Sequence, residues 1–285
     1  MADERSYYND LVANDIIDMI RPALTANGYK IRWGDGKFHA ELSMAYETPW
    51  HHIKHDGTLD CHTWHSILFD VIYKRLGTKM VPSKCQQCWK VVVRPPTLLA
   101  LFALEEVQKQ LDRPSKCGIE VRETVHGLYG GYFYNHSLEQ GLECYKTVRA
   151  AVDAEPLLGP DVPVILKRAC TEFEHEVGPS DKWEVTDEQR HIEALVDRWV
   201  VQDPMVQDQP DYLINRVHRR WVEFAYAAGD GTYAHFTNGE PIYPAYVTYH
   251  HLAEEERPAP KKRKVKVAGK DAETAAIDTK GIEKR

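Results

Sequence analysis

The chain has 285 residues, of which 43% are hydrophobic and 28% charged, and its formal net charge at pH 7 is −7. This composition is typical of a globular protein with one large or two ordinary domains, and the acidic balance argues against a protein that coats nucleic acid with its whole surface. No apolar stretch approaches the roughly 20 residues that a membrane span needs, and MADERSYYND lacks the basic and then apolar pattern of a signal peptide. We therefore expect a cytoplasmic protein without a membrane partner, whose cysteines are reduced.

Residues 1–80 are expected to form a helix, a β-hairpin and a His-rich segment that pack on the rest of the protein. The spacing of apolar residues predicts a helix over 6–26, which an Asn-Gly pair ends. Alternation on both sides of the turn sequence GDG then predicts a hairpin. The His-rich segment is 50–65, and the stretch that follows, SILFDVIYKRLG, predicts a helix that ends at its glycine.

Residues 81–180 show the most regular pattern, in which β-runs and amphipathic helices follow the order β-α-β-β-α-β. The four β-runs are WKVVVR, GIEVRE, LYGGYFYN and VPVILKRACTEFE. A capping box of Ser137 and Gln140 opens the second helix. This order predicts an α+β fold, and it resembles the ferredoxin-like (βαββαβ) scaffold.

Residues 181–252 are expected to form a helical extension, whose first helix opens with a capping box of Thr186 and Gln189. Residues 253–285 are basic and almost without large apolar side chains, which predicts a disordered tail. Within it PKKRKV, residues 260–265, resembles a monopartite nuclear localisation signal. Nuclear import is one interpretation of this tail, and nonspecific contact with nucleic acid or a solubilising role is the other.

Four cysteines are expected to meet at one edge of the core sheet. The letters PSKC occur twice, so that Cys85 and Cys88 precede the first strand and Cys117 the second, while Cys170 lies late in the fourth. In the βαββαβ arrangement these strand ends share an edge. Cys85, Cys88, Cys117 and Cys170 are therefore the predicted ligands of a tetrahedral Zn2+ site, and a 4Fe–4S cluster on the same ligands is the alternative.

Ordinary buried thiols are the competing interpretation for these cysteines. It is the one we prefer for Cys144, which lies mid-helix beside an apolar stripe. Other candidate ligands near the expected site are His136, Cys61, His62 and His65. A histidine beside Asp56 or Asp60 is also a candidate general base.

Strand alternation predicts a second site, on the face of the sheet that turns away from the two helices. Only Glu120 is expected to be acidic there. The predicted ligand-binding side chains on this face are Lys90, Arg94, Arg122, Tyr132, Tyr134 and Lys167. Aromatic rings among cations suit stacking on bases while neutralising phosphates. LYGGYFYN resembles the aromatic central strand of RNA-recognition domains, although it lacks the basic residue before the first glycine. The alternative is that the C-terminal helices cover this face.

We therefore expect a zinc-binding protein that binds nucleic acid or a nucleotide through this face and its basic tail. The alternative is an iron–sulfur enzyme with redox or radical chemistry on an anionic or nucleotide substrate, although the radical motif Cys-x-x-x-Cys-x-x-Cys is missing. A third interpretation is a metal-dependent hydrolase that uses the His-rich segment with Glu172 or Glu174. The sequence leaves open whether the protein is an enzyme.

Overall fold

The computed structural model describes residues 18, 20–22, 25–26, 29–42, 49–54, 64–202, 209–243, 247 and 249–255. They belong to two compact units, Met1–Ile242 and Tyr243–Arg285. In the second unit the structure describes one helix, α11 (His250–Glu255), at the start of the expected tail. Most of the expected helix 6–26, much of the His-rich segment and the tail from 256 onward lie outside the described residues. No helix of the described part is long and apolar enough to cross a membrane.

The first unit mixes helices and strands, which confirms the expected α+β class. Its strands are β1 (Tyr29–Gly34), β2 (Lys37–Leu42), β3 (Trp50–Lys54), β4 (Trp89–Val93), β5 (Ser115–Ile119), β6 (Tyr129–Asn135), β7 (Val164–Arg168) and β8 (Val200–Gln202). Its helices are η1 (His65–Tyr73), α4 (Lys74–Leu76), α5 (Ser83–Gln86), α6 (Leu98–Leu111), α7 (Leu138–Ala154), α8 (Thr171–Val177), η2 (Ser180–Lys182), α9 (Asp187–Trp199), α10 (Asp211–Ala228) and η3 (Gly231–Phe236).

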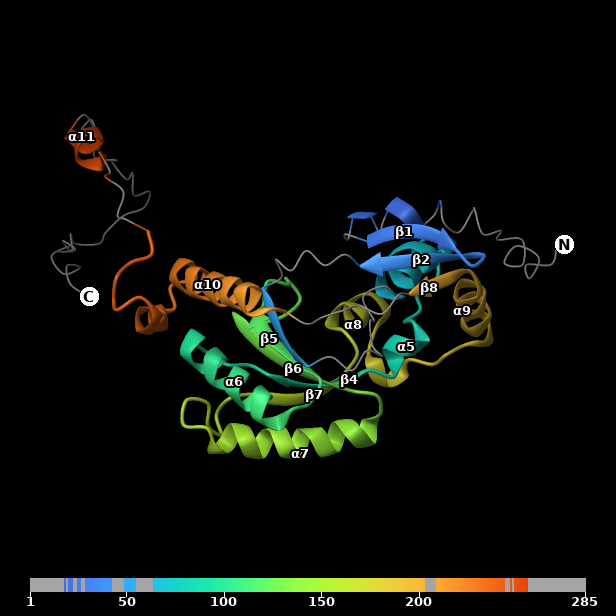
Figure 1. Ribbon diagram of the computed structural model, residues 1–285, viewed down its shortest axis with the longest axis horizontal. Coiled ribbons are helices and arrows are strands. Elements are labelled where there is room, and N and C mark those ends of the chain that lie inside the picture. Colours follow the sequence, from blue (N-terminus) through green and yellow to red (C-terminus); the bar gives the residue numbers. More distant parts are fainter. Residues whose placement is uncertain are drawn as a thin grey trace, which may run out of the picture. The chain divides into compact units, whose positions relative to one another are not determined.

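The central sheet has the strand order β3-β5-β6-β4-β7, and each strand is antiparallel to its neighbours. Helices α6 and α7 cover one face of this sheet (Figure 1). On that face Val91 and Val93 of β4 pack in one apolar cluster with Leu104 of α6 and Val148 of α7. Because side chains alternate along a strand, Lys90 of β4 turns to the opposite face, as the sequence predicts.

A smaller sheet has the order β1-β2-β8. The hairpin β1-β2 was expected, and its turn residues Asp35 and Gly36 have φ angles of 51° and 71°. Two consecutive left-handed residues suit the twist of a two-residue hairpin. Beside this sheet η1, α8 and α9 bury Ile67, Phe173 and Val196 in a common core.

Helix α10 packs on α6 and on the β3–β5 edge of the central sheet. Its fully buried Trp221 donates a hydrogen bond from Nε1 to the carbonyl oxygen of Pro49, 2.7 Å away. Leu101 of α6 and Cys117 of β5 belong to the same apolar cluster as Trp221. The helix therefore packs on the side of the sheet that carries α6.

Several element bounds differ from the prediction. β5 covers Ser115–Ile119 instead of 118–123. Directly after it, Glu120 still donates its backbone N–H to the carbonyl oxygen of Leu128, and its carboxylate pairs with Arg122. β7 ends at Arg168, because Ala169 has a left-handed backbone (φ 51°) that a β-ladder does not accommodate. A short helix, α8, follows it in place of a longer strand. Strand β3 was not predicted, and η1 is wound as a π-helix.

Candidate functional site

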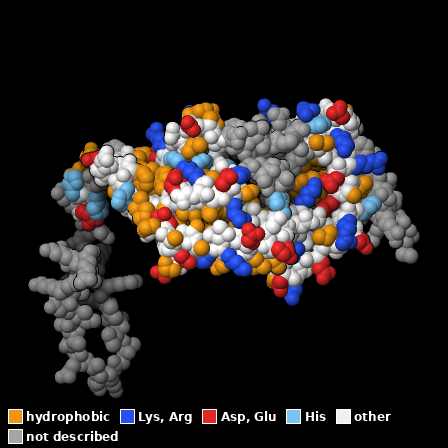
Figure 2. Space-filling model, turned by 60° about the horizontal axis from the view of Figure 1, so that its bottom comes forward, with side chains coloured by type: hydrophobic (Ala, Val, Ile, Leu, Met, Phe, Trp, Pro, Cys, Tyr) orange, Lys and Arg blue, Asp and Glu red, His pale blue; other side chains and the backbone are white. Residues whose placement is uncertain are grey.

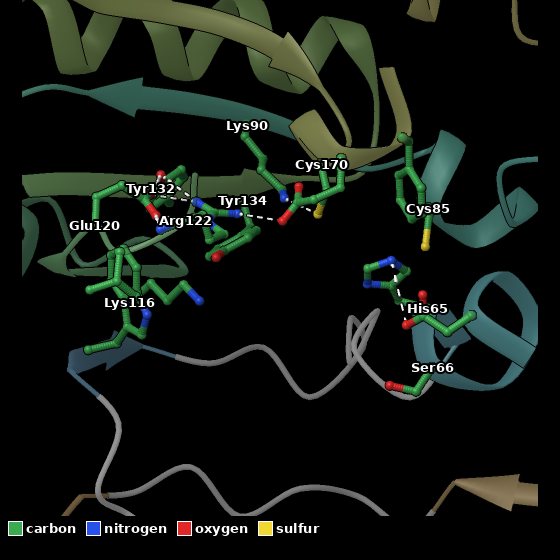
Figure 3. Close-up of a pocket in the computed structure, with 15 residues that line it drawn as sticks. His65, Ser66, Cys85, Lys90, Lys116, Glu120, Arg122, Tyr132, Tyr134 and Cys170 are labelled. Atoms are coloured by element: carbon green, nitrogen blue, oxygen red, sulfur yellow. Dashed lines mark hydrogen bonds and ion pairs between the residues drawn. The ribbon is translucent and has the colours of Figure 1, made fainter. Parts of the chain in front are cut away.

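A pocket of about 430 Å³ lies against the face of the central sheet that turns away from α6 and α7 (Figure 3). Strands β3, β4, β5 and β6 contribute to its walls, together with η1 and α8. The lining residues are Trp50, His65, Ser66, Asp70, Cys85, Lys90, Lys116, Glu120, Val121, Arg122, Tyr132, Tyr134, Cys170, Glu172 and Phe173. Its volume is that of a small-molecule site.

Cations in this pocket lie beside aromatic rings. The Nζ atom of Lys116 lies 4.8 Å from the centre of the Trp50 ring, and that of Lys90 lies 5.7 Å from the centre of the Tyr134 ring. Both distances are within the range of a cation–π interaction. The predicted combination of cations with aromatic rings on this face is therefore present in the pocket.

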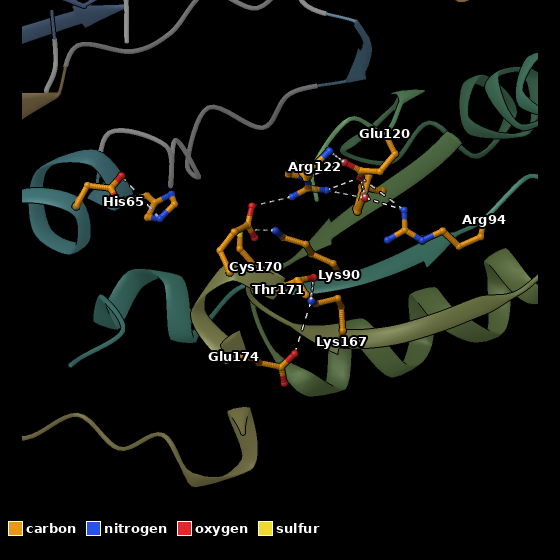
Figure 4. A network of polar contacts seen from close by, with 12 residues as sticks. His65, Lys90, Arg94, Glu120, Arg122, Lys167, Cys170, Thr171 and Glu174 are labelled. Atoms are coloured by element: carbon orange, nitrogen blue, oxygen red, sulfur yellow. Dashed lines mark hydrogen bonds and ion pairs between the residues drawn. The ribbon is translucent and has the colours of Figure 1, made fainter. Parts of the chain in front are cut away.

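Glu120 organises the guanidinium groups at this site (Figure 4). Arg122 donates from Nη2 to one carboxylate oxygen of Glu120 at 2.6 Å and from Nε to the other at 2.8 Å. Tyr132 donates its hydroxyl to Glu120 at 2.5 Å, and Arg94 donates to that hydroxyl at 3.0 Å. Arg122 also donates a hydrogen bond from Nη1 to Glu172, in the first turn of α8, at 3.2 Å. The network holds the ring of Tyr132 and both arginines in fixed positions.

This network keeps Glu120 ionised although its side chain is completely buried. Burial alone would raise the pKa of Glu120, but the hydrogen bonds from Arg122 and Tyr132 outweigh it and lower the pKa to about 2. Burial and the hydrogen bond to Glu120 raise the pKa of Tyr132 to about 12. The pocket wall therefore carries a fixed carboxylate at neutral pH and a neutral phenol that donates to it.

Lys90 is buried and donates from Nζ to the sulfur of Cys170 at 3.0 Å. Lys167 lies on the neighbouring strand and donates to the hydroxyl of Thr171 at 2.6 Å. Burial, followed by the charge of Lys90, lowers the pKa of Lys167.

Cys170 is positioned by a strained residue. Ala169, with φ at 51°, donates its backbone N–H to the carbonyl oxygen of Cys88 at 2.8 Å. This conformation costs a non-glycine residue about 1 kcal/mol or more, and it turns the chain from β7 into α8 at the point where Cys170 enters the pocket. The bond to Cys88 brings the predicted Cys-x-x-Cys pair and Cys170 to the same end of the sheet.

Cys85 and Cys170 both line the pocket, and Cys88 lies behind them, buried. Burial, followed by the neighbouring Cys170 and Cys88, raises the pKa of Cys85. Within the described part of the chain, the sulfur atoms of these three cysteines do not lie within 4.8 Å of one another. An ion bound by them would have to draw them closer.

Cys117 does not join the other three cysteines, so the expected convergence of four is wrong in this respect. It pairs with Gly131, which in turn pairs with Val93 at the far end of β4 from Cys88. Four residues of strand correspond to about 13 Å. Alternation also turns Cys117 toward α6 and the apolar cluster of Trp221, and burial, followed by the charge of Glu105, raises the pKa of its thiol.

The remaining predicted residues are divided between the pocket and its surroundings. Lys90, Arg122, Tyr132 and Tyr134 line the pocket, whereas Arg94 and Lys167 do not. Arg94 contacts the lining residue Tyr132, and Lys167 contacts Thr171 and Glu174, which lie outside the lining. Glu120 was predicted to be the only acidic side chain on this face of the sheet. The helices that close the pocket add two further acidic residues to its lining, Asp70 of η1 and Glu172 of α8. Val121, expected beneath the helices, is 65% exposed because β5 ends before it.

Other candidates from the sequence are placed as follows. Cys144 is fully buried in the cluster of α7, as expected of an ordinary core thiol. His136 is exposed at the end of β6 and does not line the pocket. His65 does line it. Cys61, His62, Asp56 and Asp60 lie outside the described residues.

Sequence reasoning missed Trp50 and Lys116, which supply a ring and a cation to the pocket. Trp50 belongs to β3, whose alternating WHHIK stretch was absorbed into the His-rich segment. Lys116 lies two residues before the expected start of its strand. An earlier start for β5 would have predicted that Lys116 shares a face with Glu120.

Comparisons with protein-family models, with curated proteins and with solved structures found no significant match.

Proposed function

We propose that the protein binds a nucleotide, free or as one unit of a single strand, in the pocket on the helix-free face of the central sheet. The observation that carries this proposal is the meeting of Lys90 and Lys116 with the rings of Trp50 and Tyr134 in one pocket. Ammonium groups pair with phosphate oxygens, and rings of this kind stack on bases.

The size of the pocket favours a nucleotide-sized ligand over a long strand. A volume of about 430 Å³ suits one small molecule. Figure 2 draws the molecule with the bottom of Figure 1 turned forward, and on that face acidic and basic side chains are interspersed. Affinity is therefore expected to come from the pocket.

Titration of the full chain tests the proposal, with intrinsic tryptophan fluorescence for nucleoside phosphates and anisotropy for short single-stranded oligonucleotides. Lys116→Ala is expected to weaken binding about tenfold, because it removes a cation without touching the Glu120 network. Tyr134→Ala is expected to do the same by removing a stacking surface. Binding to oligonucleotides should weaken as salt is raised.

Lys146→Ala is the matched control, since Lys146 is exposed on α7 on the opposite face of the sheet. It should leave affinity unchanged. Equal affinities of the Lys116→Ala, Lys146→Ala and unmodified proteins, or no binding by the unmodified protein, would contradict the proposal.

A zinc ion held by Cys85, Cys88 and Cys170 is proposed as the second property of this end of the sheet. The backbone contact of Ala169 with Cys88 supports it, because it brings Cys170 beside the Cys-x-x-Cys pair. His65 lines the same pocket and is the candidate fourth ligand. An iron–sulfur cluster on these thiols, with redox or radical chemistry on an anionic substrate, remains the alternative, and a metal-dependent hydrolase ranks below both.

Elemental analysis and absorption spectra of anaerobically purified protein test the metal and its identity. Cys170→Ser is expected to lower the bound zinc, whereas Cys117→Ser, on the other side of the sheet, is expected to leave it unchanged. A brown, iron-containing protein would favour the iron–sulfur alternative. Zinc retained equally by all variants would exclude the thiols as ligands.

The strand order β5-β6-β4-β7 with two helices on one face supports a ferredoxin-like core (Figure 1).

The described cysteines are all free of disulfides, which supports a reducing, cytoplasmic location. Nuclear import through residues 260–265 is testable by fusing the tail to a fluorescent reporter.

A further inference from the structure

Three side chains from distant parts of the chain meet on the opposite side of the central sheet from the pocket. His51 lies on β3, Glu105 on α6 and His218 on α10. Trp50 faces the pocket, so alternation turns the next residue, His51, toward α6. His218 follows the buried Val217 on the face of α10 that packs toward α6 and β3.

Both imidazoles point a ring nitrogen at the same carboxylate oxygen. Nδ1 of His51 lies 2.6 Å and Nε2 of His218 lies 3.0 Å from Oε1 of Glu105. The three ligand atoms all lie within 4.8 Å of one another. Ligands of a tetrahedral zinc ion lie about 3.3 Å apart, because bonds of about 2.0 Å meet there at tetrahedral angles. Small shifts therefore convert this cluster into a coordination shell.

The surroundings hold the cluster in place while leaving it access to solvent. The side chains of His51 and Glu105 are 7% and 1% exposed, whereas that of His218 is 25% exposed. Phe102 and Trp221 each place a ring 5.0 Å from the imidazole of His218 and fix its orientation. The exposed side of His218 gives an entry path for an ion.

The carboxylate of Glu105 is almost completely buried and has both imidazoles and one ammonium group around it. Lys109 lies 3.1 Å from the same carboxylate oxygen. Its half-exposed side chain also pairs with Glu106, 2.7 Å away, so it has a partner when an ion takes its place at Glu105.

We propose that His51, Glu105 and His218 form a binding site for a divalent transition-metal ion of the zinc class, with water in the fourth position. Two imidazole nitrogens and one carboxylate oxygen are the ligand set of such open zinc sites. The ion clamps β3 and α10 to α6. It is separate from the proposed thiolate site, which lies at another end of the sheet and on its other face.

Metal uptake by the full chain tests this site. Protein treated with a chelator is titrated with Zn2+ by calorimetry and with Co2+ by absorption, in a Cys85→Ser/Cys170→Ser background that removes the thiolate site. We expect one equivalent of each ion to bind and the cobalt spectrum to lack the thiolate charge-transfer band. Glu105→Gln and His218→Asn should each weaken zinc binding about 100-fold or more. Loss of a residue that only supports a ligand lowers metal affinity about 10- to 100-fold, and loss of the ligand itself should lower it further.

The matched control is His235→Asn on η3, which is exposed. It should bind zinc like the parent. Because Glu105→Gln can impair folding, the thermal midpoint of the parent is also measured with and without Zn2+, and zinc should raise it in the parent and not in His218→Asn. No uptake by the parent, or equal uptake by His218→Asn and the parent, would overturn the site. The metal site does not depend on the proposed nucleotide pocket. If the protein binds no nucleotide, the outcome of the zinc titration still stands.

Discussion

Glu120 shows how a single buried side chain determines which cations of the pocket are available to a ligand. Its carboxylate accepts two hydrogen bonds from the guanidinium of Arg122 and one from the hydroxyl of Tyr132. These contacts use up donors that the sequence suggested for phosphate. The guanidinium groups of Arg94 and Arg122 lie against the ring of Tyr132, whereas Lys90 and Lys116 lie against the rings of Tyr134 and Trp50 and take no part in the Glu120 contacts. The residue predicted as the lone acid on this face is therefore the one that arranges the others.

Glu120→Gln is expected to lower the free energy of unfolding at neutral pH by on the order of 3 kcal/mol, because it leaves two guanidinium groups beside a neutral partner in a buried position. Urea unfolding measures the effect. Glu123→Gln is the control, since Glu123 is exposed in the following loop. A loss no larger than that of the control would mean that the Glu120 network contributes nothing to stability.

At the scale of elements, two glycines allow close packing around the central sheet. A Cβ atom at Gly118 of β5 would overlap the backbone carbonyl oxygen of Pro49, next to β3. One at Gly131 of β6 would overlap the side chain of Leu104 on α6. Gly131, the second glycine of LYGGYFYN, therefore faces helix α6. The backbone neighbour of Gly118 cannot move as readily as a leucine side chain.

Gly118→Ala is therefore expected to destabilise the protein more than Gly131→Ala, by about 1 to 3 kcal/mol in each case, as for other overpacked sites. Gly231→Ala is the control, because a Cβ atom there has no neighbour within 4 Å. Thermal unfolding of the three variants gives the order. A Gly118→Ala protein as stable as Gly231→Ala would show that β3 is not packed as closely on β5 as described.

Helix starts could be read from the sequence because they depend on neighbours in the chain. Ser137 accepts a hydrogen bond from the backbone N–H of Gln140, and Thr186 accepts one from that of Gln189, as both capping boxes predict. The ends of the strands were predicted less accurately. β5 ends directly before Glu120, whose carboxylate accepts a hydrogen bond from Tyr132 of β6, and β7 ends directly before Ala169, which is left-handed and donates to Cys88. Both ends therefore involve contacts with other segments of the chain.

For the molecule as a whole, buried carboxylates make stability depend on pH. Glu105, Glu120 and Asp230 each have a pKa below the usual value in the folded protein, because hydrogen bonds outweigh the burial that would raise it. Asp230 accepts from the backbone of Leu98 and the hydroxyl of Tyr129. A carboxyl with a depressed folded pKa stabilises above its unfolded pKa, and this contribution is lost as pH falls toward the folded value.

We therefore expect stability to be constant around neutral pH and to fall as pH drops from about 4.5 toward about 2, the interval over which Glu120 titrates. Glu120 alone accounts for on the order of 3 kcal/mol of this loss. Urea unfolding at successive pH values measures the profile, and Glu120→Gln should flatten it. A stability that rises on acidification would contradict the assignment of these carboxylates.

The sequence by itself determined the properties that depend on local neighbours. Alternation placed Lys90, Tyr132 and Tyr134 on one face of a sheet, and capping residues placed the starts of α7 and α9. Only the tertiary structure decided which side chains meet. The register of β5 separates Cys117 from the other cysteines, and the packing of α10 on α6 and β3 brings His51, Glu105 and His218 together. The residues of this cluster come from segments more than 50 residues apart in the sequence, since His51 and Glu105 are separated by 54 positions. No local pattern encodes them, because strand register and helix docking are set by the combined packing of the whole core.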